Sequence, residues 1–194
     1  MKLLNVVLDL DNTLLHTVHN DEHEMLNEHN IYPEQTFKFV DYSNFNSKIY
    51  FRPFLKEFLD ELFDNDDKFR VSIFTAGSED YALDVVTKII LNPPFTSRRG
   101  KLKKLKYVYS LEQYNDSKTL GIGPKDLNIF FNKDNTMDAS NTVLIDDVLE
   151  NVSSNGDSAI QIEPFFVHIS TRTDKELLKV MGRLFHLHSK INQV

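Results

Sequence analysis

The sequence predicts an α/β fold built on a Rossmann-like parallel sheet with helices on both of its faces. Apolar, β-branched runs of strand length occupy residues 3–9, 69–74 and 141–147. Segments with the apolar spacing of a helix, 54–62 and 79–91, follow in alternation with the strands. This order is typical of a parallel sheet with helical crossovers. In such sheets, ligands bind at the carboxyl ends of the strands.

The composition is that of a globular protein, and we expect residues 1–194 to form one domain. Hydrophobic residues make up 41% and charged residues 26% of the 194 positions. The net charge of −7 argues against direct binding of nucleic acid. The absence of cysteine excludes disulfides, thiolate zinc sites and a cysteine nucleophile. No stretch has the length of a membrane span or the form of a signal peptide, so we expect a soluble, intracellular protein of the nucleus or cytoplasm, with no membrane partner.

Two carboxylates follow the first strand, at Asp9 and Asp11. Alternate side chains of an extended chain share a face, so both carboxylates point into the same small volume. Two like charges are costly together unless a cation intervenes, which favours a hard divalent metal such as Mg²⁺. One carboxylate could then act as a nucleophile while the other transfers a proton. The alternative is an acidic turn after a core strand.

Residues 16–30 form a polar segment with four histidines, at positions 16, 19, 23 and 29. Spacings of three and four residues would place His16, His19 and His23 on one helix face, where they could bind a metal. The alternative is a solvated polar excursion without a ligand.

The next two elements are a hairpin and a helix. Alternating apolar residues in 36–51, on either side of the polar stretch 41–47, predict a β-hairpin inserted into the fold. Pro53 is then expected at the first position of a helix that carries the apolar stripe of 54–62.

The second core strand runs directly into Thr75-Ala76-Gly77-Ser78. A hydroxyl at the carboxyl end of a strand, with the backbone N–H beside it at Ala76, can donate to phosphoryl oxygens. Ser78 is also expected to cap the helix over 79–91, and a plain helix cap would explain the motif without a ligand.

A basic insert follows at residues 98–109, and its interleaved Leu and Tyr predict a strand or hairpin. Arg98 and Arg99 could contact an anionic substrate, because they form a local cationic patch in an acidic protein. The alternative is the charged face of a surface hairpin, which needs no ligand.

A second pair of acids ends the strand over 141–147, at Asp146 and Asp147. Packing alone does not explain two strands that both end in acid pairs, because buried carboxylates need partners. Lys125 supplies a cation after the flexible approach 121–123, before a short helical turn at 129–130.

The chain is expected to end with two further elements. Residues 159–162 predict a last short strand. Residues 173–176, Thr-Asp-Lys-Glu, have the pattern of a capping box that begins a terminal helix.

Residues 8–16, LDLDNTLLH, resemble the first motif of the haloacid dehalogenase superfamily. More narrowly, the chain resembles the small carboxy-terminal-domain phosphatases and their TFIIF-associating relatives, the NLI interacting factor-like family, which dephosphorylate serine in the tail of RNA polymerase II. The supporting matches follow in the family's order and span nearly the whole chain: Phe51-Arg52-Pro53, Ile73-Phe74-Thr75-Ala76-Gly77-Ser78 with Tyr81-Ala82, Lys125-Asp126-Leu127, Leu144-Ile145-Asp146-Asp147, Ala159-Ile160-Gln161-Ile162 and the stretch 173–177.

The resemblance implies a role for each matched position. Asp9 would be the nucleophile that forms an aspartyl-phosphate. Asp11 would protonate the leaving seryl oxygen and then activate water. Thr75 would hydrogen-bond the phosphoryl group and Lys125 would neutralise it, a cation being needed because a carboxylate and a phosphate dianion repel each other.

The resemblance also implies a bound Mg²⁺. Asp146 and Asp147 would complete its shell with Asp9 and the backbone carbonyl of Asp11. Asp147 stands where the small phosphatases have Asn, and a carboxylate there is as good a Mg²⁺ ligand, so we expect activity to survive.

Other departures from the family are Asn12 in place of a frequent Glu and Gly77 in place of a frequent Ser. The segment 95–124 is longer than the family's insert, and such enzymes choose their phosphopeptide there. The resemblance implies a Mg²⁺-dependent phosphatase of phosphoserine or phosphothreonine in an extended peptide, such as the RNA polymerase II tail. The alternatives are a small-metabolite phosphatase of the same superfamily, disfavoured by the lack of a large cap domain, and a non-catalytic module that binds phosphopeptides.

Overall fold

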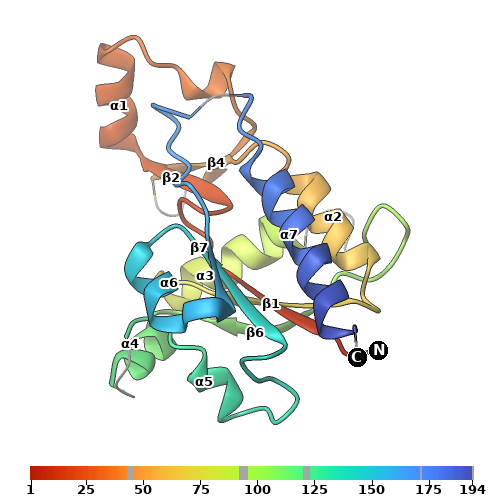
Figure 1. Ribbon diagram of the computed structural model, residues 1–194. Coiled ribbons are helices and arrows are strands. Elements are labelled where there is room, and N and C mark those ends of the chain that lie inside the picture. Colours follow the sequence, from red (N-terminus) through yellow and green to blue (C-terminus); the bar gives the residue numbers. More distant parts are fainter. Residues whose placement is uncertain (43–45, 92–95, 120–122, 171, 194) are drawn as a thin grey trace.

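The computed structural model describes residues 1–42, 46–91, 96–119, 123–170 and 172–193, and its centre is a five-stranded parallel sheet (Figure 1). The strands lie in the order β6-β5-β1-β7-β8, and every neighbouring pair is parallel. This confirms the predicted fold class. The bounds are β1 Leu4–Leu8, β5 Phe69–Phe74, β6 Leu105–Tyr109, β7 Thr142–Asp146 and β8 Ala159–Gln161.

Strand β1 is fully buried because its alternating side chains enter two different cores. Val6 and Leu8 pack in the larger core, to which helices α2 (Leu55–Asp64) and α7 (Glu176–Ile191) contribute their apolar faces. Val7 packs in the smaller core on the opposite face, with Phe130 of α5 (Asn128–Phe131). A strand buried on both faces needs a continuous apolar run, which is the pattern that predicted it. Its carboxyl end is therefore held rigidly.

The other helices are α3 (Glu79–Val85), which continues as a π-helical turn over Val86–Ile90, then α4 (Leu111–Thr119) and α6 (Leu149–Asn155). The helix expected over 79–91 is thus present, with Ser78 as its N-cap: the Ser78 hydroxyl accepts from the Tyr81 N–H at 3.3 Å. Short 3₁₀ turns occupy Pro33–Gln35 and Gly156–Ser158. No helix among the described residues is both long and apolar enough to span a membrane.

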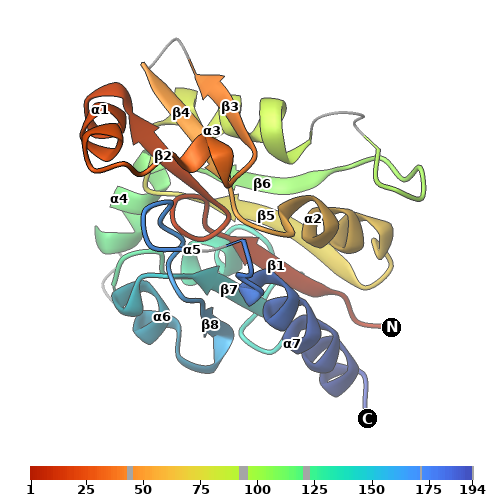
Figure 2. The ribbon, with the colours of Figure 1, turned by 90° about the horizontal axis from the view of Figure 1, so that it is seen from above.

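A smaller antiparallel sheet stands above the carboxyl edge of the large one, in the order β2-β4-β3 (Figure 2). Its strands are β2 Leu15–His19, β3 Phe39–Tyr42 and β4 Ser47–Phe51, and α1 (Asn20–Glu28) follows β2. The predicted hairpin corresponds to β3 and β4, and residues 43–45 of its turn lie outside the described residues. The sequence did not reveal that β2 adds a third strand.

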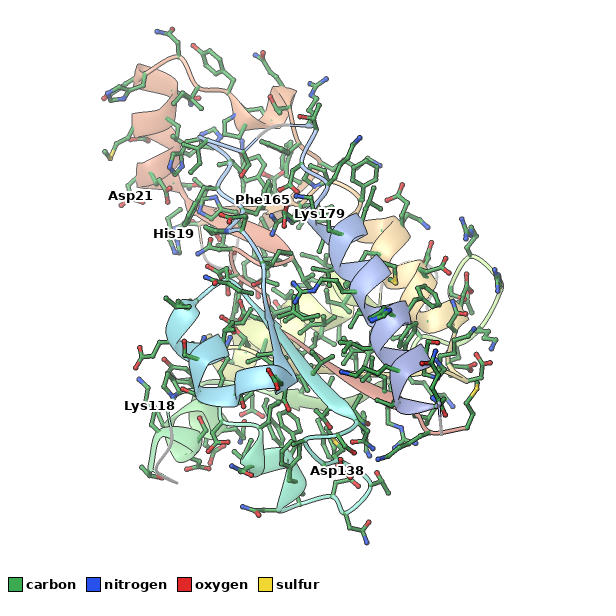
Figure 3. The ribbon with its side chains drawn as sticks, viewed as in Figure 1. His19, Asp21, Lys118, Asp138, Phe165 and Lys179 are labelled. Atoms are coloured by element: carbon green, nitrogen blue, oxygen red, sulfur yellow. The ribbon has the colours of Figure 1, made fainter. Side chains whose placement is uncertain are left out.

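The histidine segment does not form one helix. His16 and His19 lie on strand β2, whereas His23 belongs to helix α1. The three therefore do not share a helix face, and the predicted metal site there is wrong. His16 is buried, at 8% exposed, whereas His19 and His29 are exposed, so the alternative of a solvated polar segment holds for all but its first residues. Figure 3 shows His19 at the end of β2, close to Asp21 in the first turn of α1.

Two predicted helix starts are shifted. Helix α2 begins at Leu55, two residues after Pro53, because Phe54 takes a left-handed conformation with φ 66°. Helix α7 begins at Glu176, so Thr173 is too far away to act as its N-cap and the capping box is wrong. The cap is instead supplied by Asp174, whose carboxylate accepts from the Glu176 N–H at 2.8 Å.

Candidate active site

The carboxyl ends of three neighbouring strands, β5, β1 and β7, bring the predicted site residues to one rim of the sheet. Thr75 follows β5, Asp9 follows β1 and Asp146 ends β7. All three are buried, with exposed fractions of 5% or less. Parallel neighbours place their ends side by side, so side chains separated by over a hundred residues meet here.

Lys125 lies at the centre of this rim. Its Nζ donates to Asp9 Oδ1 at 2.5 Å and to Asp146 Oδ2 at 2.7 Å. Burial alone would lower the pKa of Lys125, but the two carboxylates outweigh it and raise the pKa. Lys125 has φ 52°, a strained conformation for a residue with a side chain, which persists only where the surroundings impose it. Its N–H and C=O are held by Ser117 and Asn155.

The pKa of Asp9 is strongly shifted by its surroundings. Burial raises its pKa to about 7, although the nearby Lys125 ammonium opposes the rise. Asp146 is held more completely, because its second oxygen accepts from the Val148 N–H and the Asn151 amide, both at 2.9 Å. Asp9 is therefore oriented by Lys125 through one oxygen, whereas both oxygens of Asp146 accept hydrogen bonds.

Three carboxylates have the geometry to hold a metal ion. One oxygen each from Asp9, Asp146 and Asp147 can be chosen such that all lie within 4.8 Å of one another. Asp147 also accepts from the Thr13 hydroxyl at 3.2 Å, and burial raises its pKa. An all-oxygen, carboxylate-rich donor set suits Mg²⁺ and does not suit a soft metal. The residues present therefore fit the predicted ion.

The Asp11 carboxylate lies outside this cluster and faces another set of groups. Tyr81 donates its hydroxyl to Asp11 Oδ1 at 2.5 Å, and Thr17 donates to the same oxygen at 3.2 Å. Burial raises the pKa of Asp11, against the opposing effect of these hydrogen bonds. This separates the two acids of the first motif: Asp9 faces the lysine, whereas Asp11 faces two hydroxyls. Whether the Asp11 carbonyl is a metal ligand stays a prediction.

A cleft of about 450 Å³ opens beside Asp11. Three aromatic side chains line it, Tyr42, Tyr81 and Phe166, together with His16 and His19. Thr75 lies under the rim and accepts from the Gly77 N–H at 3.0 Å, whereas Ala76 beside it is exposed. The rim therefore offers a hydroxyl, a backbone N–H and an ammonium next to a cleft that is open to solvent.

A sequence profile of the family described as NLI interacting factor-like phosphatase matches residues 4–194. The chain belongs to this family. Two relatives named putative CTD phosphatase-like protein 355R support the assignment. The one from Invertebrate iridescent virus 3 is 33% identical over 189 residues, covering 92% of this chain and 94% of the viral protein. The one from Invertebrate iridescent virus 6 is 30% identical over 188 residues, with coverage of 91% and 94%.

Solved structures agree with the fold of an NLI interacting factor-like phosphatase. The structure of Fcp1, described as an essential RNA polymerase II CTD phosphatase, matches with a TM-score of 0.52 and 21% identity over 97% of this chain. This chain spans only 50% of that Fcp1 chain. A predicted HAD-like hydrolase from Porphyromonas gingivalis matches with a TM-score of 0.52 and 16% identity, covering 95% of this chain and 98% of the hydrolase. The protein is thus a phosphatase of HAD-like fold.

Within this NLI interacting factor-like phosphatase, Arg98 and Arg99 are not at the site. Arg98 lies 3.6 Å from Glu61 and Arg99 lies 4.0 Å from Asp64, near the carboxyl end of α2. That end leads into the start of β5, at the edge of the sheet opposite the carboxyl ends of the strands, so these two ion pairs lie away from the rim. The structure does not bring the two arginines to the rim, and a substrate contact by either of them stays a prediction. The segment has the bridge of a surface hairpin, since Thr96 and Leu102 pair in antiparallel fashion. Of the flexible approach to Lys125, residues 121 and 122 lie outside the described residues.

Sequence reasoning missed the residues that support the site. Arg52 is 2% exposed and donates to the carbonyls of Thr13 and Glu163 and to Asp174. It thereby fixes the loop after Asp11, whose Thr13 contacts Asp147. The sequence shows a charged residue directly before Pro53, but it does not show the partners of Arg52, which lie up to 122 residues away along the chain.

Proposed function

We propose that this phosphatase is Mg²⁺-dependent and removes phosphate from phosphoserine or phosphothreonine in an extended peptide, with Asp9 as the nucleophile. The observation that carries the proposal is the position of Lys125 Nζ, within 2.7 Å of carboxylates from two strands, next to Asp147. When a phosphoryl group enters the site, its oxygens can accept a hydrogen bond from Lys125 Nζ in place of one of the two carboxylates. The CTD phosphatase-like relatives support a phosphoprotein substrate, and the RNA polymerase II tail is the candidate that the Fcp1 description suggests.

The first half-reaction transfers the phosphoryl group to the protein. An Asp9 oxygen attacks phosphorus, the bond between phosphorus and the seryl oxygen breaks, and Asp11 gives its proton to that oxygen. The raised pKa of Asp11 is what a proton donor needs. Thr75 and the N–H groups beside it donate to the phosphoryl oxygens, and Lys125 balances their charge.

The second half-reaction returns the site to its starting state. Asp11, now a carboxylate, takes a proton from water, the water oxygen attacks phosphorus, and the bond to Asp9 breaks with release of phosphate. Tyr81 and Thr17 orient the Asp11 carboxylate for both proton transfers. A Mg²⁺ ion held by Asp9, Asp146 and Asp147 would supply positive charge against the phosphoryl oxygens when bound.

The open cleft supports a peptide over a small metabolite, because the described residues place only a small sheet and α1 above the rim. The test is a panel of phosphoserine, phosphothreonine and phosphotyrosine peptides beside sugar and nucleotide phosphates, assayed with Mg²⁺ or EDTA, with Asp9→Asn as the control. We expect Mg²⁺-dependent release, fastest from the phosphoserine or phosphothreonine peptides. Faster turnover of metabolites would favour the small-metabolite alternative. Peptide binding without any metal-dependent release would favour a non-catalytic module.

A further inference from the structure

A second cavity, of about 300 Å³, lies away from the catalytic rim, between the small sheet and two helical segments. Its apolar walls are Val40 and Phe51 from the small sheet, Leu55 and Leu59 from α2, and Ile89 from the π-helical turn. These side chains come from four separate elements, so the cavity is a junction that the fold leaves partly unfilled. We call it and its rim the lysine groove.

Four lysines surround this apolar space: Lys38, Lys56, Lys88 and Lys103. Two buried or half-buried acids lie among them. Lys56 and Lys103 share the buried Asp60, and Lys88 pairs with Asp84 at 2.7 Å. The charge of these lysines and their acids together is positive, whereas the net charge of the chain is −7, so the groove differs in sign from the protein as a whole.

Lys103 is the most unusual of the four. Its side chain is 4% exposed, and its Nζ lies 3.4 Å from Asp60 Oδ1, an oxygen that makes no hydrogen bond among the described residues. A buried ammonium normally has hydrogen-bonded partners, and a loose ion pair leaves part of its charge uncompensated. The groove therefore combines apolar walls with a buried cation, which suits a ligand that is both apolar and anionic.

Strand β3 runs along the groove as an edge strand. It lies last in the order β2-β4-β3, and among the described strands it pairs with β4 alone (Figure 2). An edge strand presents backbone N–H and C=O groups to which an extended peptide can add. Val40 of β3 contributes to the groove, so a peptide lying along β3 would place alternate side chains over the apolar walls.

The groove also connects towards the catalytic cleft. A cavity of about 250 Å³ shares Val40, Lys88 and Ile89 with it and includes Tyr42. Tyr42 is in turn a wall of the cleft beside Asp11, and its hydroxyl donates to Asp84 at 2.5 Å. Tyr42 therefore lines both spaces, which places the groove and the catalytic cleft next to each other.

We propose that the lysine groove is a docking site for an extended protein segment in which acidic residues stand beside apolar ones. The apolar side chains occupy the cavity, the acidic side chains pair with Lys38, Lys56 and Lys103, and the backbone lies along β3. This surface is separate from the catalytic residues, so it would let the enzyme hold a protein by a segment that carries no phosphate.

The test uses an unphosphorylated, fluorescein-labelled peptide that repeats Asp-Leu-Glu-Phe, so that its result does not depend on turnover. Its affinity for the full chain is measured by fluorescence anisotropy at low salt. We expect the double variant Lys38→Glu with Lys56→Gln to weaken binding about tenfold, which corresponds to about 1.4 kcal/mol. The glutamine in the second substitution keeps a hydrogen-bond donor for Asp60. Lys190→Glu on α7 is the control for a charge reversal away from the groove, and we expect it to bind the peptide as the unchanged protein does.

Two further arms complete the design. A peptide with Asn and Gln in place of the acids should bind at least about tenfold more weakly, since the rim is cationic. Hydrolysis of p-nitrophenyl phosphate should be the same in the double variant, which shows that it is folded. Equal binding of the acidic and amide peptides, or equal binding by the double variant, would overturn the proposal. Binding of anionic lipid vesicles, or a dimer dissolved by the double variant, without any peptide binding would overturn it in favour of another occupant.

Discussion

Replacement of Lys125 by Met removes the cation that lies between two buried carboxylates of the described rim, and it should destabilise the protein strongly when no divalent metal is present. The side chains of Lys125, Asp9 and Asp146 are 3%, 7% and 0% exposed, so water cannot compensate for the lost ammonium. Breaking such a buried pair costs about 3–5 kcal/mol. The variant could instead keep a proton on Asp9. Because the pKa of Asp9 is already about 7 in the unchanged protein, a proton on Asp9 would bring the loss towards the lower end of this range.

The assay is urea unfolding of Lys125→Met and the unchanged protein at pH 7, each in EDTA and in excess MgCl₂. We expect the loss of about 3–4 kcal/mol in EDTA, and a larger stabilisation by Mg²⁺ in the variant than in the unchanged protein, because the ion replaces the missing positive charge. Lys179→Met is the control, since the Lys179 side chain is 69% exposed, and its unfolding should match that of the unchanged protein. Equal stability of Lys125→Met and the unchanged protein in EDTA would refute the reasoning.

Three further predictions concern the groups around the site. Burial lowers the pKa of His16 to about 4, so above its unfolded pKa of about 6.5 its contribution to stability is complete, and it is lost as the pH falls towards 4. Between pH 7 and pH 5 the unchanged protein should therefore lose about 2 kcal/mol more unfolding free energy than His16→Gln, and parallel losses would contradict this origin. Gly77→Ser would place a Cβ 2.6 Å from Tyr81 Cδ1, so the Tyr81 ring must move and its hydrogen bond to Asp11 should break. We expect kcat to fall about tenfold. The control Gly182→Ser has open space around its Cβ and should leave kcat unchanged. Arg52→Met should lower the free energy of unfolding by about 3–5 kcal/mol in urea titrations, because Asp174, whose side chain is 10% exposed, and two carbonyls lose their donor; a loss below about 1 kcal/mol would show that the contacts are dispensable.

The core of the fold could be predicted because its signals are local. Strands β1, β5 and β7 are mainly apolar runs that stop at a charged or hydroxyl residue, and the parallel order then brings Asp9, Thr75 and Asp146 together without further information. Strand β2 could not be found in this way, because its sequence, LHTVH, is half polar. It is extended through its pairing with β4, from Leu15 opposite Phe51 to His19 opposite Ser47.

The site could be predicted in its acids but not in its supporting contacts. Tyr81 lies on the stripe that predicts α3, and a stripe residue is expected in the core, not on Asp11. The contact joins residues 70 positions apart and depends on where α3 docks. The position of Arg98 and Arg99 could not be predicted for a related reason: a basic cluster shows a local charge but not the edge of the sheet on which it lies, and the ion pairs with Glu61 and Asp64 decide that position.

The central claim is that Asp9 carries the phosphoryl group during turnover, and the most direct measurement is the mass of the acid-quenched protein. Asp11→Asn should be used with p-nitrophenyl phosphate and Mg²⁺, because this leaving group needs no proton and the missing base slows hydrolysis of the intermediate. We predict one added phosphoryl group on the proteolytic fragment that contains Asp9, and none when Asp9→Asn is combined with it. Turnover by the unchanged protein without any phosphorylated fragment, or with the group on another residue, would contradict the account.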